Sequence, residues 1–196
     1  MFFRKDVKMT PHFIGRNQIK FRVNVPNLHT TMSNKNEFFK LANHPFKFRM
    51  YLLNKLPAAF FSGVRVREID EEKCITSIPF KWLTQNPFRS TYFASLAMAA
   101  EMSTGTLALS NVYKRTPSVS MLLTKMEAIY FKKATGTILF VCEQGKEMAI
   151  IINDAIKTGE GRSIIAKSAG TNKNGELVAE FFFTWSFKAR PNKTTV

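Results

Sequence analysis

Histidine is scarce in this 196-residue chain, and its placement limits the chemistry that the chain can carry out. The three histidines, His12, His29 and His44, all lie before residue 45. The remaining chain has no imidazole for a Ser/His/Asp or Cys/His arrangement and no His-rich set of metal ligands. An enzyme with this sequence must work with carboxylate, hydroxyl, amide and backbone groups, and we expect no bound metal.

Cysteine is equally rare. The two cysteines, Cys74 and Cys142, lie far apart within strand-like runs. This spacing is typical neither of a zinc site nor of the disulfide framework of a small secreted protein. Two buried, reduced thiols are the simplest interpretation, and they predict a cytoplasmic protein.

No apolar run reaches the roughly 18 uninterrupted residues of a transmembrane helix. Residues 92–109 come closest, but they contain Glu101 and several hydroxyl side chains. We therefore expect no membrane partner. A hydrophobic share of 45% with 19 phenylalanines argues for a folded globular domain.

Acidic residues are few, with 14 Asp and Glu against 29 Lys and Arg, a formal net charge of +15. The positive electrostatic field of such a chain favours binding of nucleic acid, anionic lipid or a nucleotide-bearing molecule such as coenzyme A. The chain has no Gly-aromatic RNA-binding signature, Cys/His finger or basic recognition-helix pattern, so we expect no nucleic-acid partner.

The first 31 residues differ from the rest, since they show no sustained period and contain six Lys or Arg and one Asp. They are predicted to be a basic extension, either flexible or absent from the native protein, with Met32 as the natural start. Ser33 is a plausible helix N-cap directly after it. Residues 32–196 are predicted to form a single domain.

The apolar patterns predict alternating helices and strands, and a helix that is apolar all round must be covered on most sides. A curved antiparallel sheet wrapped around a long central helix would cover it, giving an α+β fold with extra N-terminal helices. The predicted elements are two short helices over residues 34–55 broken at Pro45, paired strands at 63–70 and 73–80, the long helix at 91–109, strands at 120–134 and 136–144, a helix at 146–161, and a hairpin at 161–190 that turns at Asn174 and Gly175.

One acid stands out within the long apolar helix. Glu101 is the only Asp or Glu between Glu72 and Glu127. An ionised carboxylate in apolar surroundings is costly, so it needs a partner, a shifted pKa or a function. Three interpretations follow: a catalytic group, a structural pair with a buried Arg, Lys or Tyr, and a solvent-facing residue.

The run "NPFRSTYFASLAMAAE" from Asn86 to Glu101 resembles the signature of hotdog-fold acyl-CoA thioesterases of the phenylacetyl-CoA thioesterase type. Their pattern is Asn, five residues, His-Gly-Gly, one residue, Leu, four residues, then Asp or Glu. Here Asn86, Leu96 and Glu101 match, while Tyr92, Phe93 and Ala94 replace His-Gly-Gly. The same substitution and a "NGELVAEFFFTWSFK" ending are typical of a less characterised branch of that superfamily.

The resemblance implies a hotdog fold whose protomers pair as homodimers, which can assemble further into tetramers. It implies hydrolysis of acyl-CoA or acyl-carrier thioesters, with Glu101 as general base or nucleophile at the dimer interface. Ser103 and Thr104 are then hydrogen-bond candidates for that carboxylate. Tyr92, Phe93 and Ala94 would sit at the helix N-terminus, where unpaired N–H groups suit an oxyanion, and Asn86 would orient the carbonyl or a water.

The only cofactor-like group implied is the coenzyme A of the substrate. Its phosphates would be held by Lys132, Lys133 and Lys125, with Lys114 and Arg115 behind them; a solvated charged edge is the alternative for these cations. Phe181, Phe182, Phe183 and Trp185 would line an acyl tunnel or simply form the core. Because His-Gly-Gly is replaced, a non-catalytic acyl-CoA binding protein on the same fold is the alternative function.

Overall fold

The computed structural model describes residues 28–190, so most of the basic extension predicted over residues 1–31 lies outside the described residues. The backbone of its last four residues belongs to the first helix, α1 (Leu28–Ala42). Ser33 therefore lies inside α1, and its prediction as an N-cap was wrong. Residues 28–42 contain no proline or glycine, so helical backbone continues through Ser33.

Two prolines and a histidine set where the two helices after α1 begin. His44 caps α2 (Pro45–Lys55) by accepting a hydrogen bond at Nδ1 from the Lys47 N–H, 3.4 Å away. Pro45 and Pro57 each occupy the first turn of a helix, where a missing N–H costs nothing, and Pro57 starts the short α3 (Pro57–Ser62). His44 thus has a structural role as a helix cap.

Six strands form one antiparallel sheet in the order β1-β2-β4-β5-β6-β3. The predicted pairing of β1 with β2 and the predicted hairpin of β5 with β6 are confirmed, the hairpin turning at Gly175 with φ +78°. β3 and β4 follow one another in the chain but are not neighbours, since β3 pairs with β6 at the edge of the sheet. The strands are β1 (Arg65–Ile69), β2 (Cys74–Ile78), β3 (Val119–Tyr130), β4 (Ile138–Cys142), β5 (Arg162–Thr171) and β6 (Leu177–Ala189).

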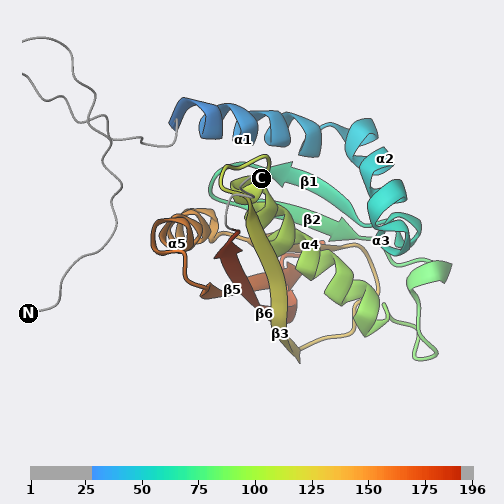
Figure 1. Ribbon diagram of the computed structural model, residues 1–196. Coiled ribbons are helices and arrows are strands. Elements are labelled where there is room, and N and C mark those ends of the chain that lie inside the picture. The colour runs from blue at the N-terminus through green and yellow to red at the C-terminus, as the bar shows by residue number, and fades with distance from the viewer. Residues whose placement is uncertain (1–27, 191–196) are drawn as a thin grey trace, which may run out of the picture.

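The sheet curves around α4 (Phe93–Val112), which packs against β2, β4, β5 and β6 (Figure 1). Most of α4 is buried, and hydrogen bonds tie it to the sheet. Thr76 Oγ1 donates to the Ala99 carbonyl at 2.7 Å, and Trp185 Nε1 donates to Thr104 Oγ1 at 3.0 Å. These bonds satisfy polar groups that would otherwise be buried unpaired.

The core lies between α4 and the inner face of the sheet. Alternate residues of β6 point into it, and Phe181, Phe183 and Phe187 are fully buried. Each such side chain contributes about 1.5–3 kcal/mol of transfer free energy. α5 (Gly145–Thr158) adds Met148 and Ile152, while α1, α2 and α3 line the top and right of the view in Figure 1.

Cys74 and Cys142 are buried, free thiols that face each other across β2 and β4. Desolvation raises the pKa of both thiols, that of Cys142 to about 11. They remain protonated at neutral pH and are poor nucleophiles.

Candidate active site

The first backbone N–H groups of α4 lack a hydrogen-bond acceptor among the described residues. Tyr92 is the N-cap, its side chain makes no capping hydrogen bond, and its own N–H donates to the Thr84 carbonyl at 2.7 Å. The N–H groups of Ser95 and Leu96 turn back to the Tyr92 carbonyl. Within residues 28–190 the N–H groups of Phe93 and Ala94 have no such acceptor, so they remain available at the positive end of the helix dipole.

A pocket of ≈ 560 Å³ surrounds this helix end. The segment that precedes α4 forms one wall, and the segment after β3 forms the other. Five of the predicted site residues are among those that line it: Asn86, Tyr92, Phe93, Lys132 and Lys133. The structure thus brings together groups that are more than 40 positions apart in the sequence.

Asn86 shapes one wall of this pocket. Its side-chain oxygen accepts hydrogen bonds from the Phe88 N–H, the Ser90 N–H and the Ser90 hydroxyl at 3.0, 3.2 and 3.2 Å. The carbonyl of the amide is therefore used in building the loop, and only its Nδ2 could serve a substrate.

Aromatic side chains stand at the mouth of the pocket. The rings of Tyr92 and Phe93 meet edge to face, with centroids 4.7 Å apart, and both side chains are exposed. Tyr92 is therefore not packed into the core. Phe93 adds bulk where glycine would leave open space, while Ala94 adds only a methyl group.

Glu101 lies two turns further along α4, in a separate pocket of ≈ 140 Å³. Helix α2 covers this pocket with Phe48, Tyr51 and Leu52, and β3 contributes Met121. The carboxylate is half-buried and makes no hydrogen bond or ion pair with any residue in 32–190. Desolvation raises the pKa of Glu101 above its usual value.

The hydroxyl groups predicted as partners of Glu101 bond elsewhere. Ser103 Oγ bonds to the Ala100 carbonyl and to Ser168 Oγ, at 2.7 and 2.8 Å. Thr104 Oγ1 donates to the backbone carbonyl of Glu101 at 3.0 Å, not to its carboxylate. Buried helical Ser and Thr commonly satisfy themselves on the preceding turn, so neither stabilises the ionised form of Glu101.

Gly105 makes room for the carboxylate, a role that sequence reasoning missed. A Cβ at this position would lie 2.7 Å from Glu101 Oε1 and 3.2 Å from the Trp185 ring. Glycine inside a helix costs about 1 kcal/mol relative to alanine, so a glycine four residues after a lone acid is itself a signal of close packing.

The predicted phosphate-binding cations are dispersed. Lys132 is paired with Glu176, and Lys125 is paired with Glu127 on β3. Lys133 is exposed and has no ion pair within the described residues. Lys114 pairs with Glu37 and Arg115 bonds to Asn153, both at the opposite end of α4 from the larger pocket.

In the part of the chain that the structure describes, most of the aromatic residues predicted to line a tunnel form the core. Phe181, Phe183 and Trp185 belong to the core, and none of them lines either of the two pockets. Phe182 faces the opposite side of the sheet from Phe181 and Phe183 and is partly exposed.

Replacing Glu101 with Gln is expected to stabilise the folded protein at pH 7, because it removes a carboxylate that burial disfavours. In the wild type the folded state holds the Glu101 proton to a higher pH than the unfolded state. The free energy of unfolding therefore falls as pH rises from 4.5 through the raised pKa. Below pH 4.5 the variant's advantage disappears. Urea unfolding across this range tests the prediction, and a difference independent of pH would contradict it.

Comparison with known proteins agrees with the fold. The model of a domain of unknown function, DUF4442, matches residues 47–187. Protein PA5026 from Pseudomonas aeruginosa, "Probable Thioesterase", is 18% identical with a TM-score of 0.64, and the match covers 74% of this chain and 97% of that chain. No functionally curated protein matches the sequence significantly.

Two further solved structures have the same architecture. Protein OLEI01261 from Chlorobaculum tepidum, of unknown function, is 16% identical with a TM-score of 0.63, covering 76% of this chain and 99% of that chain. Thioesterase HI1161 from Haemophilus influenzae is 10% identical with a TM-score of 0.54, covering 76% and 93%. The predicted hotdog fold, with its curved antiparallel sheet, is confirmed.

The described part of the chain has neither a membrane-spanning helix nor a metal-binding cluster. Every helix in residues 28–190 is too short or too polar to span a bilayer. The same residues contain no group of three or more His, Cys, Asp or Glu placed to hold a metal ion.

Proposed function

The chain belongs to the DUF4442 family of the thioesterase-like hotdog superfamily, and we propose that it hydrolyses acyl-CoA or acyl-carrier thioesters with Glu101 at a site shared by two protomers. One observation carries this proposal. Glu101 holds a half-buried carboxylate in a mainly apolar pocket, without a hydrogen bond or ion pair among the described residues. A carboxylate kept at such a cost is a candidate catalytic group.

One chain cannot bring Glu101 to its own oxyanion donors. Glu101 follows Phe93 by eight residues, which is about 12 Å along a helix. The two groups also open into different pockets. A second copy of the chain is the simplest source of an α4 N-terminus that could face Glu101.

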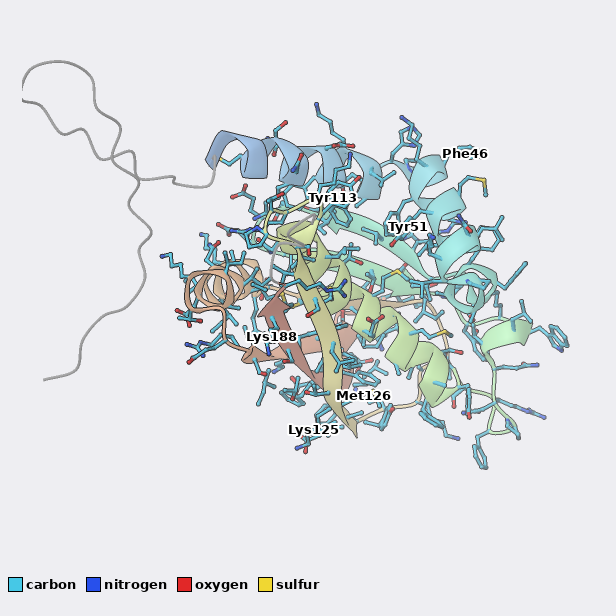
Figure 2. The ribbon with its side chains drawn as sticks, viewed as in Figure 1. Phe46, Tyr51, Tyr113, Lys125, Met126 and Lys188 are labelled. Atoms are coloured by element: carbon cyan, nitrogen blue, oxygen red, sulfur yellow. The ribbon has the colours of Figure 1, made fainter. Side chains whose placement is uncertain are left out.

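The edge strand β3 suggests how two copies would meet. It is twelve residues long, and several large apolar side chains on it are exposed, including Leu122, Met126 and Ile129. An exposed apolar edge of this length is a template for pairing with another strand. In the view of Figure 2, β3 lies in front with Met126 labelled near its lower end.

β3 also connects the two pockets. Met121 lines the Glu101 pocket, and Tyr130 lines the pocket at the N-terminus of α4. Antiparallel pairing of two β3 strands about a two-fold axis near Met126 would set Met121 of one protomer opposite Tyr130 of its partner. This pairing would bring the Glu101 of one protomer toward the open α4 N-terminus of the other.

The chemistry needs these two parts. Acting as a base, Glu101 would take a proton from water, whose oxygen adds to the thioester carbonyl carbon while the carbonyl oxygen becomes an oxyanion. The N–H groups of Phe93 and Ala94 would stabilise that oxyanion. Collapse of this tetrahedral intermediate re-forms the carbonyl and breaks the C–S bond. The departing thiolate takes the proton from Glu101. Direct attack by Glu101 would instead form a mixed anhydride that water then hydrolyses.

A panel of short, long and aromatic acyl-CoAs tests the function directly. We expect thiol release by the purified protein with at least one of them, and the preferred chain would identify the substrate class. Acyl thioesters of a carrier protein should be assayed in parallel.

A non-catalytic acyl-CoA binding protein is the alternative, and the bulk of Phe93 at the helix N-terminus favours it. Binding of acyl-CoA by calorimetry without any thiol release, in both wild type and Glu101→Gln, would support this alternative.

Phe93→Pro is expected to lower kcat by about 10²- to 10³-fold, because it removes one oxyanion donor. Proline is tolerated at the first position of a helix, and Tyr92, with φ −61° and ψ 136°, already has the backbone conformation preferred before proline. Phe93→Ala is the matched control, since it removes the ring and keeps the N–H. Equal losses in the two variants would show that the ring matters rather than the donor.

A further inference from the structure

Helix α2 has two apolar faces. Phe48 and Leu52 are buried against the core. On the opposite side, Phe46, Met50 and Leu53 recur at the i, i+4, i+7 spacing of a single stripe and are 69%, 40% and 39% exposed. We call these three residues the outer stripe. The core needs only the buried face, so the outer stripe requires another explanation.

Exposed aromatic side chains also lie on the segments that follow α2 in the chain. Phe61 of α3 is exposed, and Lys81 Nζ donates to its backbone carbonyl at 2.8 Å. Lys81 precedes the short 3₁₀ helix Trp82–Thr84, whose Trp82 side chain is 79% exposed. α2, α3 and this helix lie along the same side of the molecule in Figure 1, and Phe46 is labelled at its periphery in Figure 2.

The segments that carry the outer stripe, Phe61 and Trp82 are basic. Residues 38–67 contain six Lys or Arg and no acid, and residues 73–100 contain three and again no acid. Lys47 and Lys55 are exposed on α2. Arg49 lies beside the stripe over the Phe60 ring, 3.9 Å from its centroid. Exposed apolar side chains, a tryptophan and a surplus of cations therefore occur together on α2, α3 and the 3₁₀ helix.

We propose that the outer stripe, with Phe61 and Trp82, docks the protein on the surface of an anionic lipid bilayer. A helix with a basic rim and an apolar stripe lies in the bilayer interface, its stripe among the acyl chains and its cations at the phosphates. Tryptophan is favoured at the same depth. The protein lies on the bilayer and does not span it. This inference departs from the expectation, drawn from the lack of a spanning segment, that no membrane is among the partners.

Other occupants fit this surface less well. A symmetric contact between two α2 helices would place Lys47, Arg49 and Lys55 against the same cations, and residues 38–67 contain no acid to compensate. Nucleic acid would use the charge but not the aliphatic Met50 and Leu53. Anionic lipid offers a partner for both features.

Vesicle flotation tests the proposal with the full chain, independently of catalysis. The protein is expected to float with phosphatidylcholine vesicles containing phosphatidylglycerol, to float poorly with phosphatidylcholine alone, and to dissociate as salt rises. The combined variant Phe46→Ser, Met50→Ser and Leu53→Ser should reduce the bound fraction roughly ten-fold. Lys47→Glu with Lys55→Glu should weaken binding to the anionic vesicles only.

Ile150→Ser on α5 is the matched control, because Ile150 is 66% exposed and lies outside this surface. Residues 1–31 are present in every variant, so any binding by that segment cancels. No flotation with anionic vesicles, or full flotation of the triple variant, would overturn the proposal. A change in the mass of the triple variant in solution without lipid would overturn it as well, and would assign the stripe to a second copy.

Discussion

Glu101→Gln is expected to lower acyl-CoA turnover by about 10²- to 10⁴-fold, the range observed when a general base is removed. Gln keeps the size of the side chain and so keeps its fit beside Gly105, but it cannot accept the proton of water or attack the thioester. The loss should therefore appear in kcat while the affinity for acyl-CoA changes little. Thiol-release kinetics and calorimetry with both proteins measure these two quantities.

Glu143→Gln provides the control for Glu101→Gln, because Glu143 is an exposed carboxylate outside both pockets. Full activity of Glu101→Gln would remove Glu101 from the mechanism and leave it as a structural acid. The combination of lost activity with the greater stability predicted at pH 7 would be hard to explain by misfolding.

The pH dependence of kcat/KM is a second test of the role of Glu101. In the proposed mechanism Glu101 reacts in its ionised form, and desolvation raises its pKa. The acidic limb of kcat/KM is therefore expected above pH 4.5, the ordinary value for this side chain, and it should be absent from the residual activity of Glu101→Gln.

Met126→Arg is expected to produce monomers and to reduce activity to about the same 10²- to 10⁴-fold extent as Glu101→Gln. Near the proposed two-fold axis the substitution would set two like charges close together between paired strands, which is destabilising. Since the side chain is 45% exposed in the single chain, the fold should survive. Sedimentation and thermal unfolding, run beside the activity assay, separate these effects, and an active monomer would contradict the shared site.

Mixed dimers offer a sharper test of the shared site. Co-refolding Glu101→Gln with Phe93→Pro chains in equal amounts should give mixed dimers with one intact site each. About a quarter of wild-type activity is then expected if the two groups act across the interface of a two-fold dimer. If both groups act within one chain, every site is defective and no activity returns.

Local sequence patterns were sufficient to predict two strand pairs, the long helix and its one acid. The hairpins β1–β2 and β5–β6 join segments that are adjacent in the chain, so turn residues and alternation predict both strands and their partners. The apolar run that became α4 is predicted for the same reason, although it begins at Phe93 rather than Thr91. Glu101 is visible as the one acid in that run, because an isolated charge needs no structure to be recognised.

Long-range pairing required the tertiary structure. Alternation along β3 does not specify a neighbour, and only the fold sets it beside β6 with its other edge free. The ion pair of Lys132 with Glu176 and the bond from Trp185 to Thr104 join residues 44 and 81 positions apart. The separation of Glu101 from the α4 N-terminus into two pockets, and the second apolar stripe on α2, also depend on which faces neighbouring elements cover. A sequence carries the propensity of each segment, whereas burial depends on what the rest of the chain places against it.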